Sequence, residues 1–238
     1  MRIKLLLISY YWPPSGGAGV QRWLTMTNFL QTEGFDVTVV VPKNPDYPII
    51  DQQLEAQVHP DIQIIKIGGF EPRNFLKRFS KNESTNFDNA LEQKNKANWK
   101  KKLMVYIRGN YFIPDARILW ARAVAKELIQ KKINFDVVIS SGPPHSLHLA
   151  AMILKNRFKK TWIADFRDPW IEVEYFDKLQ LTHRSKKKHA KLERAVLKNA
   201  DLVLTVSPSW SELFASKGAN KTATIYNGYN HLLDAWKQ

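Results

Sequence analysis

Seven short runs of apolar and β-branched residues recur along the chain, separated by segments with a helical period. The runs cover residues 3–9, 36–42, 62–67, 136–141, 161–166, 201–207 and 222–226. Runs that are apolar on both faces are typical of parallel strands covered on both sides. Helical patterns lie between most of them, at residues 18–33, 116–132, 145–158, 185–199 and 208–217. The alternation predicts an α/β fold with a doubly wound parallel sheet of about seven strands.

Residues 71–102 break this alternation. They are polar and rich in Asn and Lys, so we expect a surface insertion there. After Trp99 the apolar residues Leu103, Tyr106 and Ile107 follow at intervals of four, seven and eight, beside the three lysines 100–102. This spacing predicts an amphipathic basic helix, suited either to packing on the domain or to lying in a membrane interface.

The net charge of +14 is concentrated in two segments. Residues 71–108 hold ten Lys and Arg against four Asp and Glu, and residues 178–198 hold eight against one, so together they carry +13. Such a balance indicates an anionic partner such as lipid head groups, nucleic acid or an acidic glycan, and of these we expect a membrane surface. Solvated lysine faces on a soluble protein are an equal alternative on charge alone. No RNA-binding signature occurs, and we expect no nucleic-acid partner.

Composition excludes several kinds of site. The chain has no cysteine, which excludes disulfides and thiolate metal sites, and its six histidines lack HExxH spacing, so we expect no metal. The first residues suit a buried strand better than a signal peptide, and no later run approaches the ~20 apolar residues of a spanning helix. These features favour a cytoplasmic protein.

The segment "ISYYWPPSGGAGVQRW", residues 8–23, passes from a predicted strand through glycines into a predicted helix. Backbone N–H groups and the positive end of a helix dipole converge at such a junction and favour a phosphate, so Gly16, Gly17 and Gly19 are candidate phosphate contacts. A tight turn without a ligand is the alternative. The dinucleotide fingerprint fails, because Arg22 takes the third glycine position and the second strand ends in "VVVPKN" without an acidic residue.

Two polar stretches follow later predicted strands. In "SSGPPHSLHLAA", residues 140–151, His145 or Ser146 is placed to cap the next helix and face a crevice, with His148 one turn further. In "IADFRDPW", residues 163–170, Asp165, Arg167 and Asp168 cluster before Trp170. Two carboxylates around one guanidinium form either a self-contained ion-pair knot or a site at the carboxyl end of a strand.

These stretches, with "LERAVLKNADLVLTVSPSWSELF" and "IYNGYN", resemble the N-terminal half of a family 4 glycosyltransferase of the GT-B fold. The resemblance covers nearly the whole chain except residues 71–110. It implies that residues 1–226 form a Rossmann-like N-terminal domain with a basic insertion at 71–110. Residues 227–238 would begin the linker to a C-terminal donor domain that this sequence lacks.

What the resemblance implies for function is a retaining sugar transferase that uses a nucleotide-sugar donor and no resident cofactor. Gly16, Gly17 and Gly19 would approach the donor diphosphate. His145, Asp165, Arg167 and Asp168 would act in catalysis. On the acceptor side we expect Ser146, His148 and Trp170, with a surface polysaccharide or glycolipid as acceptor.

The sequence departs from the family pattern at two places. Many relatives have His at the end of the fifth strand, where this chain has Arg167, so no histidine role carries over to that position. The family's pair of Glu eight residues apart, which serves the donor, is absent. We therefore expect this chain alone to be inactive, and to lie peripherally on the inner face of a membrane when complete. The alternatives are a basic membrane-binding module without catalysis and a nucleotide-dependent dehydrogenase.

Overall fold

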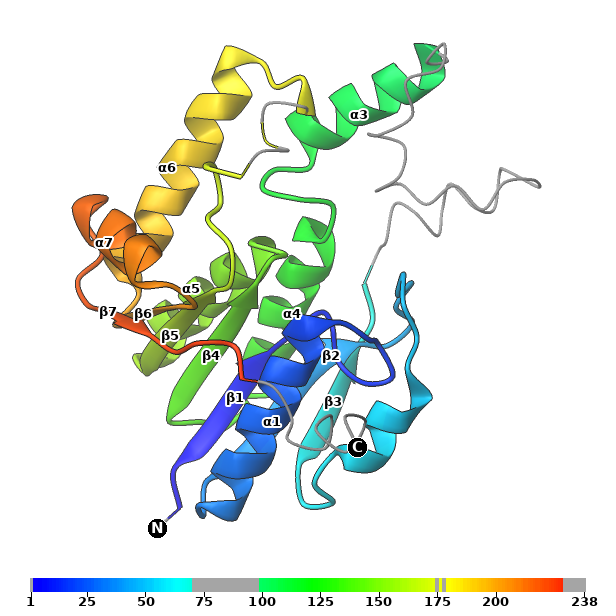
Figure 1. The fold of residues 1–238 in the computed structure, drawn as a ribbon, viewed down its shortest axis with the longest axis vertical. Helices are drawn as coiled ribbons and strands as arrows, with labels where there is room; N and C mark the ends of the chain where they lie inside the picture. The colour runs from blue at the N-terminus through cyan, green and yellow to red at the C-terminus, as the bar shows by residue number, and fades with distance from the viewer. Residues whose placement is uncertain (1, 70–98, 174–175, 177–178, 229–238) are drawn as a thin grey trace, which may run out of the picture.

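The computed structural model describes residues 2–69, 99–173, 176 and 179–228. Most of the polar insertion expected at residues 71–102 lies outside these residues. Within them the chain forms seven strands and a series of helices in alternating order (Figure 1). The strands are β1 (Lys4–Ile8), β2 (Asp36–Pro42), β3 (Gln63–Ile67), β4 (Val137–Gly142), β5 (Thr161–Phe166), β6 (Leu202–Thr205) and β7 (Thr222–Thr224).

All seven predicted strands are confirmed, and they form one sheet in the order β3-β2-β1-β4-β5-β6-β7. Every neighbouring pair is parallel. The chain builds outward from β1 to β3 and then returns to place β4 on the other side of β1. The strand order therefore reverses between β1 and β4, and ligands of open α/β sheets bind at the carboxyl ends of strands beside such a reversal.

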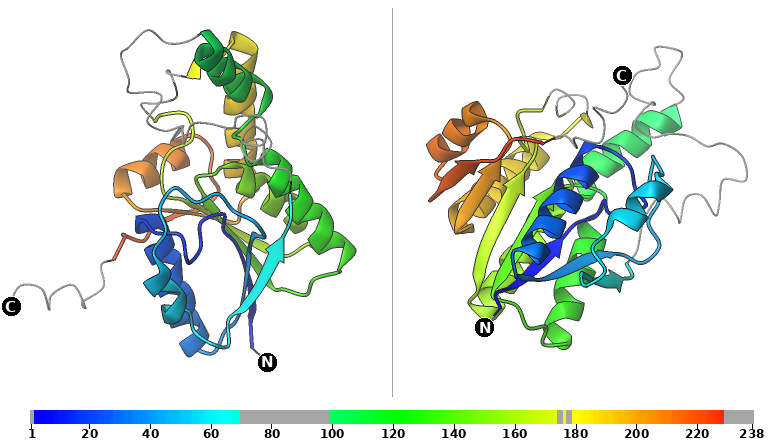
Figure 2. Two further views of the ribbon diagram at one scale, coloured as in Figure 1. Left: turned by 90° about the vertical axis from the view of Figure 1, so that its right-hand side faces the viewer. Right: turned by 60° about the horizontal axis from the view of Figure 1, so that its bottom comes forward.

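Helices cover both faces of the sheet (Figure 2). One face carries α1 (Ala18–Thr32). The other carries α4 (Ile118–Gln130), α5 (Ser146–Phe158) and α6 (His183–Asn199). The remaining helices are α3 (Trp99–Tyr111), α7 (Pro208–Ser216) and the 3-10 helix η1 (Gln52–Gln57).

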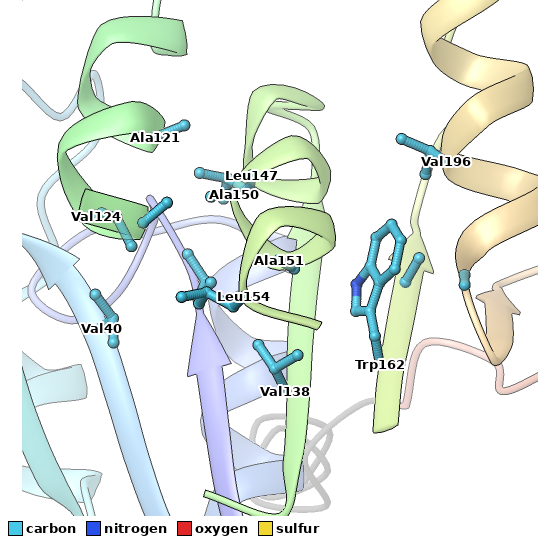
Figure 3. Packing of buried hydrophobic residues seen from close by; sticks show 14 of the residues in the cluster. Val40, Ala121, Val124, Val138, Leu147, Ala150, Ala151, Leu154, Trp162 and Val196 are labelled. Carbon is cyan, nitrogen blue, oxygen red and sulfur yellow. The ribbon is translucent and has the colours of Figure 1, made fainter. Parts of the chain in front are cut away.

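The two faces of each strand follow the alternation of its side chains. Leu6 and Ile8 of β1 belong to the core under α4 and α5, whereas Leu5 and Leu7 pack on the α1 side. Figure 3 shows the first of these cores, in which aliphatic side chains of α4 and α5 point onto the strands and Trp162 of β5 faces α6. Apolar side chains on both faces explain why the central strands are largely hydrophobic in the sequence.

Helix α3 exposes several large apolar side chains. Trp99, Leu103, Tyr106 and Ile107 are all exposed, with 67% of Trp99 accessible, so this face does not pack on the domain. The end of α3 is fixed to the segment before α6, since Asn110 Nδ2 donates to the carbonyl of Gln180 (3.2 Å) and Thr182 N–H donates to Asn110 Oδ1 (2.8 Å).

Candidate functional site

Three of the polar stretches identified in the sequence come together at the carboxyl ends of neighbouring strands. The glycine-rich segment follows β1, "GPPHS" follows β4 and "RDPW" follows β5, and these three strands are adjacent in the sheet. Register pairing aligns Ser141 of β4 with Asp165 of β5. The three stretches therefore lie together at one edge of the sheet.

The glycine-rich segment ends in an uncapped helix. Gly17 is the N-cap residue of α1 with φ of +108°, a conformation that favours glycine, and no side chain caps the helix. Gly16 N–H donates to the carbonyl of Ile49 (3.0 Å). Within the described part of the chain, the N–H groups of Gly17, Ala18 and Gly19 make no hydrogen bond. These donors, at the positive end of a 15-residue helix, are suited to an anion.

Arg167 lies directly against this helix terminus. A Cβ atom added to Gly19 would lie 1.4 Å from Nη1 of Arg167 and 2.5 Å from its Cζ, so only glycine leaves room for the guanidinium. Nη2 of Arg167 donates to the carbonyl of Pro143 (2.6 Å), which links the loops after β4 and β5. Burial lowers the pKa of Arg167, while the charges of Asp165 and Asp168 raise it. Among the described residues the guanidinium forms no ion pair within 4.0 Å, which leaves its charge available to a ligand.

Asp165 is not the partner of Arg167. It points to the α1 face of the sheet and is fully buried. Its carboxylate accepts hydrogen bonds from Arg22 Nη2 (3.0 Å), Trp23 Nε1 (2.8 Å) and Ser141 Oγ (3.1 Å). Asp165 does form a buried ion pair, but its partner is Arg22 of α1 rather than Arg167 two positions later.

Arg22 is the residue that sequence reasoning missed. It takes the third glycine position of the dinucleotide fingerprint, yet α1 packs on the sheet with the Arg22 side chain buried and paired to Asp165. The same guanidinium reaches the segment after β7, because Nη1 donates to the carbonyl of Ile225 (2.8 Å). Its failure to match a glycine fingerprint was the only signal in the sequence.

The two histidines after β4 lie in a stack of buried rings. His145 stacks on Trp170 with ring centroids 5.1 Å apart, and His148 stacks on Phe166 at 4.3 Å. Nδ1 of His148 lies 2.8 Å from Ser140 Oγ, whereas its Nε2 and both ring nitrogens of His145 are buried without a hydrogen bond of good geometry. Desolvation, assisted by the positive charge of Arg167, lowers the pKa of His145 to about 3. Desolvation likewise lowers the pKa of His148 well below its usual value.

The start of α5 is capped from a distant segment. His145 occupies the N-cap position without a side-chain bond. Asp115 instead accepts from Ser146 N–H (2.8 Å) and Ser146 Oγ (2.8 Å). Burial raises the pKa of Asp115, and these hydrogen bonds oppose the rise. Neither of the two residues expected to cap the helix does so, because a carboxylate 31 positions earlier fills that role.

Three predicted acceptor-side residues are buried in the described structure. Ser146 and His148 have no accessible surface, and Trp170 donates from Nε1 to His189 Nδ1 (3.1 Å). Any effect of these side chains on an acceptor therefore runs through the loops that they hold. Asp168 is partly exposed near Arg167 and makes no hydrogen bond with another described residue.

The buried neutral histidines predict acid sensitivity. His145 binds a proton at its ordinary value of 6.5 when unfolded but only at about 3 when folded, so the unfolded chain binds more protons over that interval. Stability should therefore fall as the pH falls, by about 1.4 kcal/mol per pH unit for each such histidine between roughly pH 6 and 4. We expect His145→Phe, which keeps a ring against Trp170, to reduce this slope by about 1.4 kcal/mol per pH unit in urea unfolding measured by fluorescence.

The same substitution at exposed His183 is the control and should leave the slope unchanged. Asp115 and Glu193 have pKa values raised by burial and act in the opposite direction, but they are present in all three proteins. An unchanged slope in His145→Phe would contradict a neutral buried His145.

The described residues hold no group of three or more His, Asp or Glu side chains able to bind a metal ion. In the same part of the chain, no helix combines the length and apolar character that crossing a membrane requires.

Solved structures share this fold at low sequence identity. Sucrose-phosphate synthase from Thermosynechococcus elongatus is 14% identical with a TM-score of 0.53, over 98% of this chain and 50% of that one. A second structure of that synthase is 13% identical with a TM-score of 0.49, over 98% and 94%. Medicago truncatula UGT71G1, complexed with UDP-glucose, is 12% identical with a TM-score of 0.47, over 91% and 48%.

At sequence identities this low, the similarity to these structures shows a shared fold and nothing more. The chain spans about half the length of the longer synthase structure. No curated protein matches the chain significantly. The family model for Glycosyltransferase Family 4, however, matches residues 16–231, a span that contains the glycine-rich turn, both later loops and the segment after β7. The chain therefore belongs to glycosyltransferase family 4.

Proposed function

We propose that this chain is the acceptor-binding half of a retaining glycosyltransferase that takes sugar from a nucleotide-sugar donor. The observation that carries the proposal is the position of Arg167 against Gly19, beside the unpaired N–H groups that begin α1. A diphosphate needs several donors and positive charge at one place. Family membership supports sugar as the group transferred.

In this proposal the chain's residues have distinct tasks. The N–H groups of Gly17, Ala18 and Gly19 donate to the donor diphosphate. Arg167 neutralises the negative charge that grows on the leaving diphosphate. Because its guanidinium is already in place before that charge develops, it lowers the activation barrier of transfer. The loops after β4 and β5 orient the acceptor, a surface polysaccharide or glycolipid. The nucleotide sugar is a substrate, and we propose no resident cofactor or metal.

Transfer should require residues beyond this chain. The described residues offer donors to a diphosphate, but a half-site recovers only part of the contacts that offset the entropy of binding. We expect the 238-residue chain to fold, to bind nucleotide sugars weakly and to form no product. The measurement is product formation from a panel of nucleotide sugars with lipid-linked and glycan acceptors, by this chain and by the chain extended with a donor domain.

We expect that the extended protein forms product and that the 238-residue chain does not. Robust transfer by the 238-residue chain, or tight donor binding by it, would place the donor site within these residues and contradict the half-enzyme proposal. If nicotinamide nucleotides raise the melting temperature of the protein and nucleotide sugars do not, the dehydrogenase alternative is favoured.

We further propose that the protein attaches peripherally to an anionic membrane. Helix α3 exposes Trp99, Leu103 and Tyr106, and its end meets the segment that leads into α6. Helix α6 presents exposed basic residues that form no ion pair with any described residue: Arg184, Lys187, Lys188, Lys191 and Arg194. Aromatic insertion beside basic side chains is the combination that interfacial helices use.

Reversing the charge of the three lysines 100–102 to Glu should release the protein from vesicles containing anionic lipid. Each lysine near such a surface contributes about 1 kcal/mol, so the triple change should weaken binding by at least about a hundredfold in co-sedimentation at low salt. As a control, we change Lys126, Lys132 and Lys159 to Glu, which gives the same change in net charge at exposed positions that form no ion pair with a described residue. Equal binding by the two triple variants would exclude a specific role for α3. Oligonucleotides in place of vesicles test the nucleic-acid alternative.

A further inference from the structure

A single buried guanidinium joins the glycine-rich helix, the sheet and the segment after β7. Arg22 is the fifth residue of α1 and is 5% exposed. Its Nη2 donates to Asp165 Oδ1 (3.0 Å). Its Nη1 faces the later segment, with the carbonyls of Ile225 and Tyr226 at 2.8 and 3.3 Å and Asn227 Oδ1 at 3.3 Å.

The segment on which Nη1 acts has little else to hold it. Side chains of Ile225 and Tyr226 are exposed, at 41% and 67%, and so are Asn227 and Gly228. Ile225 N–H donates to the carbonyl of Thr205 (2.8 Å), which extends the β6–β7 pairing by one residue. Beyond that bond, the hydrogen bonds that residues 226 and 227 make with other described residues are those from Arg22.

Asp165, the partner of Nη2 of Arg22, is held firmly in place. Asp165 is fixed by Trp23 Nε1 and Ser141 Oγ as well as by Arg22, and it lies on the central part of the sheet. A guanidinium with donors on separate nitrogens can bond a carboxylate and a set of carbonyls at once, which an ammonium group cannot do in the same geometry. A buried ion pair adds little net stability compared with apolar packing, and its best-attested role is to fix one specific arrangement of the segments that it joins.

We propose that Arg22 is a positioning residue that fixes the direction in which the chain leaves the domain. It places residues 225–227 relative to the first turns of α1, and so relative to the phosphate donors at Gly17–Gly19. The inference rests on the proposed function, in which the residues after Gly228 lead to the donor-binding half. Arg22 then aligns that half with the anion site.

The test uses the absence of cysteine from the sequence, which allows clean double labelling. Spin labels at Phe29→Cys on the exposed side of α1 and at Gly228→Cys report the distance between α1 and the departing chain by pulsed electron resonance. We expect one narrow distance in the otherwise unchanged 238-residue chain. Arg22→Lys keeps a cation for Asp165 but gives up the contacts to residues 225–227, so its distribution should broaden and lose the single maximum.

Circular dichroism at the labelling temperature confirms that each variant is folded. If Arg22→Lys does not fold, the double variant Arg22→Met with Asp165→Asn decides the matter, because it removes the guanidinium from residues 225–227 and leaves no buried charge without a partner. A distribution as narrow as that of the parent in the deciding variant overturns the proposal. The experiment contains no nucleotide or sugar. Its result therefore does not depend on whether the protein transfers sugar, and the two proposals can fail independently.

Discussion

Asp165→Asn is expected to lower the free energy of unfolding by about 3 kcal/mol or more, because removing one partner of a buried ion pair leaves the other charge uncompensated. Asp165 is fully buried and accepts three hydrogen bonds, one of them from the equally buried Arg22. The amide of Asn brings an N–H₂ group to a position where all the neighbours are donors. The loss of charge and the donor–donor conflict act in the same direction.

Asp168→Asn is the matched control two positions later. Asp168 is partly exposed and has no ion pair or hydrogen bond with a described residue, so its change should stay within about 0.5 kcal/mol. Urea denaturation of both variants at pH 7 measures the difference. If Asp165→Asn unfolds at the same urea concentration as the unchanged chain, the buried pair with Arg22 does not stabilise the fold. A role of Asp165 in turnover stays a separate prediction.

Gly19→Ala and Arg167→Ala are expected to cause the largest losses of activity in the complete enzyme. A methyl group at position 19 would overlap the guanidinium at 1.4 Å, so Arg167 must leave its place against α1. Both substitutions therefore remove the same charge from the same position. Loss of one preorganised donor to a developing anion costs about a hundredfold to a thousandfold in kcat.

The shared cause makes the pair testable by a double-mutant cycle. If Gly19→Ala acts by displacing Arg167, it should add little once Arg167 is already Ala, and the two effects on kcat/KM should be far from additive. Gly68→Ala, at a glycine where an added Cβ meets nothing within 4 Å, controls for the general effect of adding a methyl group. Fully additive losses would show that Gly19 acts independently of Arg167.

The fold was predictable because its signals are local. Most strands are apolar on both faces, and most helices between strands repeat their apolar residues at the period of a helix. The observed helix α1 ends one residue before the predicted end, and α5 begins one residue after the predicted start. The sequence also placed the polar stretches at strand ends, which parallel topology then brought together at one edge.

The partners within the site were not predictable from local pattern. Asp165 and Arg22 are 143 positions apart, and the adjacent Arg167 offered a more obvious guanidinium. Which face of β5 each side chain takes decides between them, since Asp165 points toward α1. Asp115 gave no signal either, because the helix that it caps begins 31 positions later. Pairings of this kind depend on tertiary packing, which a single sequence does not display.

An NMR titration of the ¹⁵N-labelled 238-residue chain with inorganic pyrophosphate tests the proposed anion site at the start of α1 most directly. Pyrophosphate carries the donor's diphosphate without a base or sugar, so it probes the proposed anion site alone. We expect progressive shifts of the backbone amides of Gly17, Ala18 and Gly19 and of the Arg167 side chain, with a weak affinity of about 1 mM. These shifts should be lost in Arg167→Ala. Shifts confined to the basic face of α6, with the three amides unchanged, would contradict the proposed anion site.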